Sequence, residues 1–296
     1  MTTTELFLVA MLLIYAVPFG VWRLLRLDAV APLAIVQIVC GIVLGPGLLG
    51  AFSPTFHAAV FSPAVMGPLN GIAWWGVMIF VFLAGVELDV AEAWDQRRDT
   101  IVTAGLALLL PLLLGSVVAI GLLRQSRNWV GPVGHDFQTI LGLGMACAVT
   151  ALPILVLLLE QLNILRTRFG QRVLRYASLD DVVIWAVLAL ILLDYGRLGR
   201  QALFVFVFMA ACFGVRRLLP KLAEKERWFA CLIWLALVGL AADWSGLHFM
   251  VGAFLAGLVI DARWLGVQQL DNYRGVVLAV LMPVFFLSTG LRTTWE

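Results

Sequence analysis

Long apolar runs without a single charge constrain this chain more than any other feature of its sequence. The runs from Thr100 to Leu123 and from Phe137 to Leu159 contain no Asp, Glu, Lys or Arg. A helix needs roughly 20 mostly apolar residues to cross the hydrocarbon core of a bilayer, and both runs reach that length. The runs therefore predict membrane-spanning helices.

The composition of the whole chain supports the same class. Of its 296 residues, 62% are hydrophobic and 13% are charged, whereas charged residues make up about 25% of a typical soluble domain. This balance excludes a soluble enzyme, a disordered chain and a nucleic-acid binder. At roughly 20 residues per helix plus connections, the length allows about ten spans. We therefore expect an all-α, polytopic bundle whose surroundings are a lipid bilayer.

The predicted spans lie near 6–23, 30–48, 69–88, 100–123, 138–160, 173–193, 201–219, 228–243, 245–260 and 275–291. Most of the 20 Lys and Arg residues fall in alternate loops, such as those around Arg97, Arg166 and Arg216. Because basic loops stay in the cytoplasm, this pattern places the N-terminus outside. We interpret the basic residues as orientation signals rather than a lipid-binding site, since no run is as dense as a polybasic patch.

Two adjacent carboxylates, Asp180 and Asp181, lie within the predicted span 173–193. They are about 10 Å along the helix from its cytoplasmic end, where an ionised side chain costs several kcal/mol unless it is paired or hydrated. Neighbours on a helix diverge by about 100°, so one acid can face an ion path while the other pairs with a cation. In the alternative, both acids cap a shorter helix that begins at Asp181.

Pro153 interrupts the preceding span, in the segment Ala148–Pro153 (AVTALP). It cannot donate to the carbonyl of Val149, and its ring clashes with that carbonyl, so the helix must kink or break. A break frees backbone carbonyls and the Thr150 hydroxyl at membrane mid-depth. Secondary transporters build ion sites from such half-helix ends. For Pro153 alone, a kinked helix without any site is the alternative.

Other polar residues are weaker candidates. Glu87 closes one span, where we expect it to lie in the interface or to pair with Arg97 or Arg98. His248 lies in an apolar predicted span. It has two interpretations: a residue that forms a hydrogen bond where helices pack, or part of a proton relay. Gly41 and Gly45 have the GxxxG spacing that is typical of a close contact between helices.

Several blocks resemble, in order, the monovalent cation:proton antiporters, in particular their Kef-like and electrogenic sodium/proton exchanger branch. The blocks are Gly41–Gly50 (GIVLGPGLLG), Phe82–Asp89 (FLAGVELD), Ala148–Pro153 (AVTALP), Gly246–Leu258 (GLHFMVGAFLAGL) and Met282–Arg292 (MPVFFLSTGLR). An acidic pair follows the third block, and the resemblance covers essentially the whole chain.

The resemblance implies a homodimeric exchanger with a dimerisation bundle and a core domain that contains the broken helix. It implies that Asp181 alternately binds a proton and a monovalent cation, with Asp180 as the adjacent acid. Thr150 and the backbone between Val149 and Pro153 would support the ion. The cation would be sodium, with potassium and lithium as further candidates, and no cofactor is expected. The membrane would be a bacterial inner membrane.

Members of that family continue past the block Met282–Arg292 with about three further helices. We therefore expect residues 1–296 to form a single transporter-like transmembrane domain that is truncated at its C-terminus. Two other functions stay open. One is a truncated, non-transporting paralogue that acts as a membrane partner or sensor. The other is an intramembrane aspartyl protease, which needs two acids that face each other from separate helices.

Overall fold

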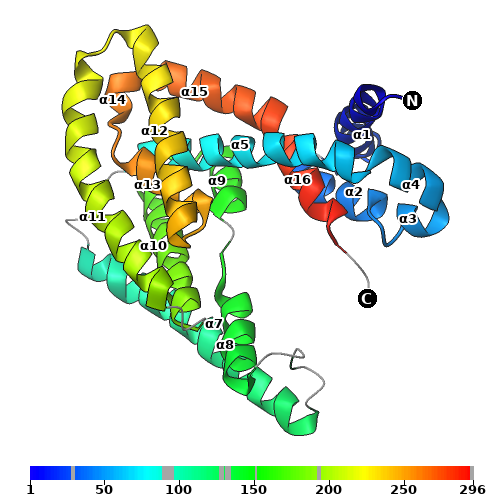
Figure 1. Cartoon of the computed structure of the whole chain (residues 1–296), viewed down its shortest axis with the longest axis horizontal. Helices are drawn as coiled ribbons and strands as arrows, with labels where there is room; N and C mark the ends of the chain where they lie inside the picture. The colour runs from blue at the N-terminus through cyan, green and yellow to red at the C-terminus, as the bar shows by residue number, and fades with distance from the viewer. Residues whose placement is uncertain are drawn as a thin grey trace. The chain divides into compact units, whose positions relative to one another are not determined.

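A computed structural model describes residues 1–27, 31–88, 97–126, 130, 135–150, 152–191 and 195–293. All regular structure in these ranges is helical (Figure 1). Seven helical segments among the described residues are long and apolar enough to cross a membrane: Thr3–Leu24, Leu33–Phe52, Pro63–Glu87, Arg98–Gln125, Gly199–Lys221, Glu224–Ser245 and Gln268–Leu291. The predicted all-α polytopic class is confirmed.

The chain divides into two compact units, and the first comprises Met1–Leu83 and Gly266–Glu296. Its helices are α1 (Thr3–Leu24), α2 (Leu33–Leu44), α3 (Leu49–Phe52), α4 (Pro54–Val60), most of α5 (Pro63–Glu87), α15 (Val267–Val276), the π-helical turn η4 (Val277–Leu281) and α16 (Met282–Leu291). The sequence pattern did not predict α3 and α4, because both are too short to form a span.

Glycines allow a very close contact between α2 and α16 in this unit. A Cβ atom on Gly41 would overlap the carbonyl oxygen of Leu287 and lie 2.9 Å from the Cα of Gly290. A Cβ atom on Gly290 would lie 2.7 Å from the amide nitrogen of Ile42. The two backbones therefore approach to a distance that only glycine permits, as in other membrane helix pairs.

The turn η4 joins α15 to α16 without ending the helix. Its π geometry precedes Pro283, whose ring nitrogen cannot donate a backbone hydrogen bond. The hydroxyl of Tyr15, on α1, donates to the carbonyl of Val280 in this turn. Further along, Nη2 of Arg292 donates to Oδ1 of Asn70 at 2.7 Å, which links the end of α16 to α5.

The second unit comprises Ala84–Leu265. After the end of α5 it contains α7 (Arg97–Gln125), α8 (Asp136–Ala148), α9 (Leu152–Gln161), α10 (Arg168–Ile191), α11 (Tyr195–Leu218), η3 (Leu219–Lys221), α12 (Glu224–Ser245), α13 (Phe249–Leu258) and α14 (Ala262–Leu265). Helices α7 and α8 pack along each other. A Cβ atom on Gly144 would lie 2.6 Å from the carbonyl oxygen of Leu112, so this contact also depends on a glycine.

Helix α13 packs tightly on α12 in the same unit. Gly246 ends α12 with a φ of 86°, a left-handed conformation that favours glycine. The indole nitrogen of Trp234 then donates to the carbonyl of Ala256 at 3.1 Å. The predicted span 245–260 corresponds to α13, which has ten residues and a length of about 15 Å. That length is roughly half the hydrocarbon thickness of a bilayer.

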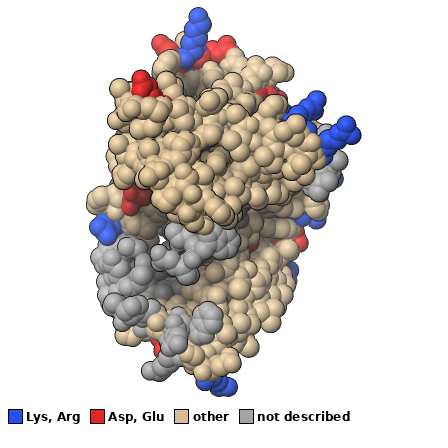
Figure 2. All heavy atoms as spheres, turned by 90° about the vertical axis from the view of Figure 1, so that its right-hand side faces the viewer, with Lys and Arg blue, Asp and Glu red and all other residues tan. Residues whose placement is uncertain are grey.

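The surface of the described helices is largely apolar. On α7, Leu106, Leu110 and Leu114 are 54%, 57% and 66% exposed, and Phe206 on α11 is 75% exposed. Figure 2 shows a face on which uncharged residues predominate. Continuous apolar exposure of this kind is unfavourable in water but suits contact with lipid. Together with the seven spans, it identifies an integral, multi-pass membrane protein.

Candidate ion-binding site

The helix interrupted by Pro153 is broken in the structure. Helix α8 ends at Ala148, and Val149 follows with φ −60° and ψ 127°, an extended conformation. Helix α9 begins at Leu152, so Pro153 occupies its first turn. Backbone N–H groups in a first turn have no partner within the helix, so proline costs no helical hydrogen bond there. The two half-helices are separate in Figure 1.

The residues around the break differ in exposure and carry polar backbone groups. Val149 is 53% exposed, and Thr150 is partly buried. The C-terminal end of α8 carries partial negative charge from its last carbonyls, and the N-terminal end of α9 carries partial positive charge. Both ends of the broken helix therefore offer polar groups within an otherwise apolar run.

The acidic pair lies well inside α10. This helix runs without interruption from Arg168 to Ile191, so the alternative in which both acids cap a helix that begins at Asp181 is wrong. The helix also starts before the predicted boundary at residue 173, because its arginine-rich first turns are helical although they are not apolar. Asp180 is therefore about 18 Å along the helix from its start, not about 10 Å.

Asp180 is 5% exposed, although it is an acidic residue. Such residues are almost never fully buried unless they are paired. Arg175, on the same helix, is 3% exposed. The side chain of Asp181 lies outside the described part of the chain. The structure thus buries the side chain of Asp180 and does not describe the orientation of the side chain of Asp181.

Both halves of the broken helix and α7 pack against α10. The hydroxyl of Tyr176 on α10 donates to Oδ2 of Asp99 on α7 at 2.7 Å. Tyr176 precedes Asp180 by about one helical turn and therefore lies on the same side of α10. This hydrogen bond links α7 to the face that carries Asp180. Nothing in the local sequence pattern pairs Asp99 with Tyr176.

Glu87 has a partner that the sequence analysis did not predict. Its Oε1 accepts a hydrogen bond from Nη2 of Arg166 at 2.8 Å, and the glutamate side chain is 4% exposed. The predicted partners Arg97 and Arg98 lie at the start of α7, whereas Arg166 precedes α10. The ion pair therefore joins the end of α5 to the segment that leads into α10.

His248 and the acidic residues show no sign of a metal centre. Nδ1 of His248 accepts from the amide of Met250 at 3.3 Å, which caps α13. This hydrogen bond lies within the first turn of α13 and does not join two helices, so the helix-contact and proton-relay interpretations of His248 both stay predictions. Among the residues that the structure describes, no group of three or more His, Cys, Asp or Glu side chains is arranged to hold a metal.

Comparison with known protein families decides the class of the chain. Residues 8–295 match the family described as "Sodium/hydrogen exchanger, transmembrane". The chain belongs to this family. Sodium/hydrogen exchangers are transporters and not enzymes, so the protease alternative is not supported.

Individual members of the sodium/hydrogen exchanger family show the same relationship. Cation/H(+) antiporter 15 of Arabidopsis thaliana is 32% identical over 88% of this chain and 33% of its own length. K(+)/H(+) antiporter 1 of Saccharomyces cerevisiae is 25% identical over 93% of this chain and 33% of its own length. Na(+)/H(+) antiporter NhaS4 of Synechocystis is 26% identical over 88% of this chain and 67% of its own length. The chain therefore spans about a third of the plant and yeast relatives.

Proposed function

We propose that the protein exchanges monovalent cations for protons across a membrane. In this proposal Asp181 is the carboxylate that alternately binds a proton and a cation, and Asp180 is the adjacent acid. Thr150, with the backbone from Val149 to Pro153, contributes oxygen ligands. The observation that carries the proposal is the burial of Asp180 on a helix packed against both halves of a broken helix.

The chemistry follows from the cost of charge inside a bilayer. A carboxylate at membrane depth is expensive while ionised and unpaired. It can be neutralised by a proton or by a monovalent cation, but a single site does not hold both at once. If only the neutralised site can change its exposure from one side to the other, the flux of one ion drives the opposite flux of the other.

The broken helix supplies what a cation needs beside the carboxylate. The C-terminal end of α8 presents carbonyl oxygens with partial negative charge, and carbonyl and hydroxyl oxygens suit hard monovalent cations. The N-terminal end of α9 balances the ionised carboxylate after the cation leaves. Both effects act next to α10, which packs on α8 and on α9.

The names of the relatives support the exchange of a monovalent cation for protons, but they name different cations. NhaS4 of Synechocystis is named a Na(+)/H(+) antiporter, and the yeast relative is named a K(+)/H(+) antiporter. We propose sodium as the cation, with potassium and lithium as the next candidates to test. Selectivity depends on the size of the cavity and on the number of ligands.

The proposal extends to assembly and location. The family resemblance supports a homodimer in a bacterial inner membrane. The distribution of Lys and Arg supports an N-terminus outside the cell. Chemical cross-linking of the protein in its native membrane tests the dimer, since a monomer would give no cross-linked pair at any reagent concentration.

Transport in proteoliposomes tests the site. We expect Asp181→Asn and Asp180→Asn to reduce cation-driven proton movement to background, because an amide takes up no proton at neutral pH and carries no negative charge for a cation to neutralise. Pro153→Ala should impair transport less completely. A pH-sensitive dye inside the vesicles reports the flux when sodium, potassium or lithium is added outside.

The matched control is Asp243→Asn on α12, where the aspartate is exposed. It removes one carboxylate from another helix and should leave the flux unchanged. Retained exchange in Asp181→Asn would contradict the site. A folded wild-type protein without flux for any of the three cations would contradict the function and favour the non-transporting alternative.

A further inference from the structure

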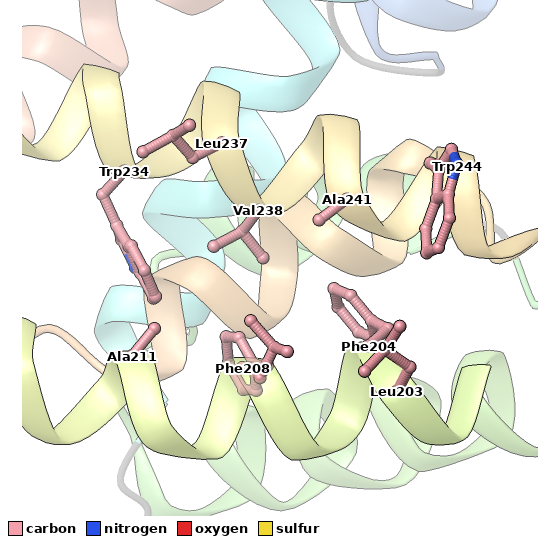
Figure 3. A pocket seen from close by; sticks show the side chains of 10 residues that line it. Leu203, Phe204, Phe208, Ala211, Trp234, Leu237, Val238, Ala241 and Trp244 are labelled. Atoms are coloured by element: carbon pink, nitrogen blue, oxygen red, sulfur yellow. The ribbon is translucent and has the colours of Figure 1, made fainter. Parts of the chain in front are cut away.

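An apolar groove lies between α11 and α12 and is lined by no residue of the proposed ion site (Figure 3). Its cavity volume is about 350 Å³, and ten hydrophobic residues from the two helices line it. Phe204, Phe208, Trp234 and Trp244 form its walls, and the small side chains of Ala211 and Ala241 leave the space between them.

The lining offers few polar groups to an occupant. Small polar ligands are oriented by a few polar groups in their pockets, and a bound water needs two to four hydrogen-bond partners. The indole nitrogen of Trp234 is already used, because it donates to the carbonyl of Ala256 at 3.1 Å. Both helices are membrane spans, so the groove lies at bilayer depth and suits a hydrocarbon chain.

The shape of the groove favours a single chain over a helix. Along α11 it extends from Leu203 to Ala211, which is about 12 Å of helix. An α-helix with its side chains is about 10–12 Å across, which is nearly the length of the whole groove. A lipid acyl chain is thin enough to enter.

Cations gather just beyond one end of the groove. The last turn of α11, η3 and the first turn of α12 carry exposed Arg216, Arg217, Lys221 and Lys225. Arg216 follows Ala211, at the groove's end, by about 7.5 Å along the helix. The guanidinium of Arg217 lies 4.1 Å from the ring centre of Phe213, an arrangement typical of a cation at a membrane interface.

Two acids in the same turns do not cancel this charge. Glu226 accepts a hydrogen bond from the amide of Ala223 at 3.1 Å and so caps α12. The exposed cations outnumber Glu224 and Glu226. By the distribution of basic loops, this end faces the cytoplasm, where the lipid leaflet carries anionic headgroups.

We propose that the groove between α11 and α12 binds one acyl chain of an anionic phospholipid of the cytoplasmic leaflet. The cations at the α11–α12 turn hold the phosphate of its headgroup. The basic residues that the sequence analysis interpreted as orientation signals thus have a second role, because the groove beside them supplies the apolar half of a lipid site. This proposal does not depend on ion exchange.

Native mass spectrometry of the detergent-purified protein tests the site. The probes are phosphatidylglycerol and phosphatidylcholine with identical acyl chains. We expect the wild type to bind phosphatidylglycerol more tightly. Ala211→Phe should weaken its binding about tenfold or more, because the added ring fills a pocket that otherwise takes several methylene groups. The matched control is Ala210→Phe, since Ala210 is exposed on the same helix but does not line the groove.

A second pair of variants tests the headgroup contact. Arg216→Gln combined with Lys221→Gln should weaken phosphatidylglycerol binding on the order of tenfold, because each cation near an anionic lipid contributes about 1 kcal/mol. Binding of phosphatidylcholine should be unaffected. Arg200→Gln, at the other end of α11, should change neither. If Ala211→Phe does not fold, Ala241→Phe fills the same groove from α12.

Four results would overturn the proposal. Equal binding by the Ala210 and Ala211 variants would show that the lipid does not use the groove. Equal affinity for the two phospholipids would remove the headgroup contact, and full competition by glycerol phosphate would show a site for free phosphate alone. Cross-links between groove residues of two copies would identify a dimer interface instead.

Discussion

Glu87 and Arg166 form an ion pair, and their side chains differ greatly in exposure. The glutamate side chain is 4% exposed and the arginine side chain 47%. Removing the partner of a buried charge costs more than removing the charge itself. We therefore expect Arg166→Gln to lower the free energy of unfolding by about 1–3 kcal/mol, and Glu87→Gln to lower it less. Thermal unfolding of the purified variants in detergent measures both changes.

A double-mutant cycle supplies the control at this scale. If the pair interacts as its 2.8 Å separation indicates, the double variant should be more stable than the sum of the two single changes predicts. The expected coupling is about 0.5–3 kcal/mol. Strictly additive changes would mean that the contact contributes nothing to stability.

At the scale of elements, glycines control how closely helices pack. A Cβ atom at position 41 would meet the backbone of α16, including the Cα of Gly290 at 2.9 Å. We therefore expect Gly41→Ala to destabilise the protein by about 1–3 kcal/mol, the usual cost of overpacking. Gly20→Ala is the matched control, because nothing lies within 4 Å of a Cβ there. That change should be neutral or stabilising by up to about 1 kcal/mol. Thermal unfolding compares the two, and equal changes would contradict the close contact.

At the scale of the whole molecule, the spans and the basic loops together predict a topology. In a background without the four native cysteines, Lys221→Cys should react with an impermeant maleimide only from the cytoplasmic side. Ser126→Cys, after α7, should react only from the outside, because loops with few cations are translocated. Labelling of both positions from one side would contradict the alternating arrangement. Labelling of Lys221→Cys from the outside would also place the lipid groove's basic end in the wrong leaflet.

The membrane class, the approximate spans and the broken helix were readable from the sequence because they depend on local properties. A bilayer requires each segment to be apolar and to satisfy its own backbone hydrogen bonds, so hydropathy and a single proline carry the information. The predicted span 100–123 lies within α7, and the break lies between Ala148 and Leu152, so Pro153 is in the first turn after it. The family resemblance was carried by the same local blocks, and the family match confirmed it.

The remaining features required tertiary structure, because they join residues that are distant in sequence. Hydropathy does not show that α10 continues through its arginines to begin at Arg168, since hydrogen bonding rather than apolarity maintains that turn. Nor does it show that Glu87 pairs with Arg166, or that the side chain of Asp180 is buried. The sequence by itself determined which segments can enter the membrane and where one of them breaks. Only the packing of α7, α8 and α9 on α10 decided that Asp180 is buried there, because burial depends on the neighbouring residues.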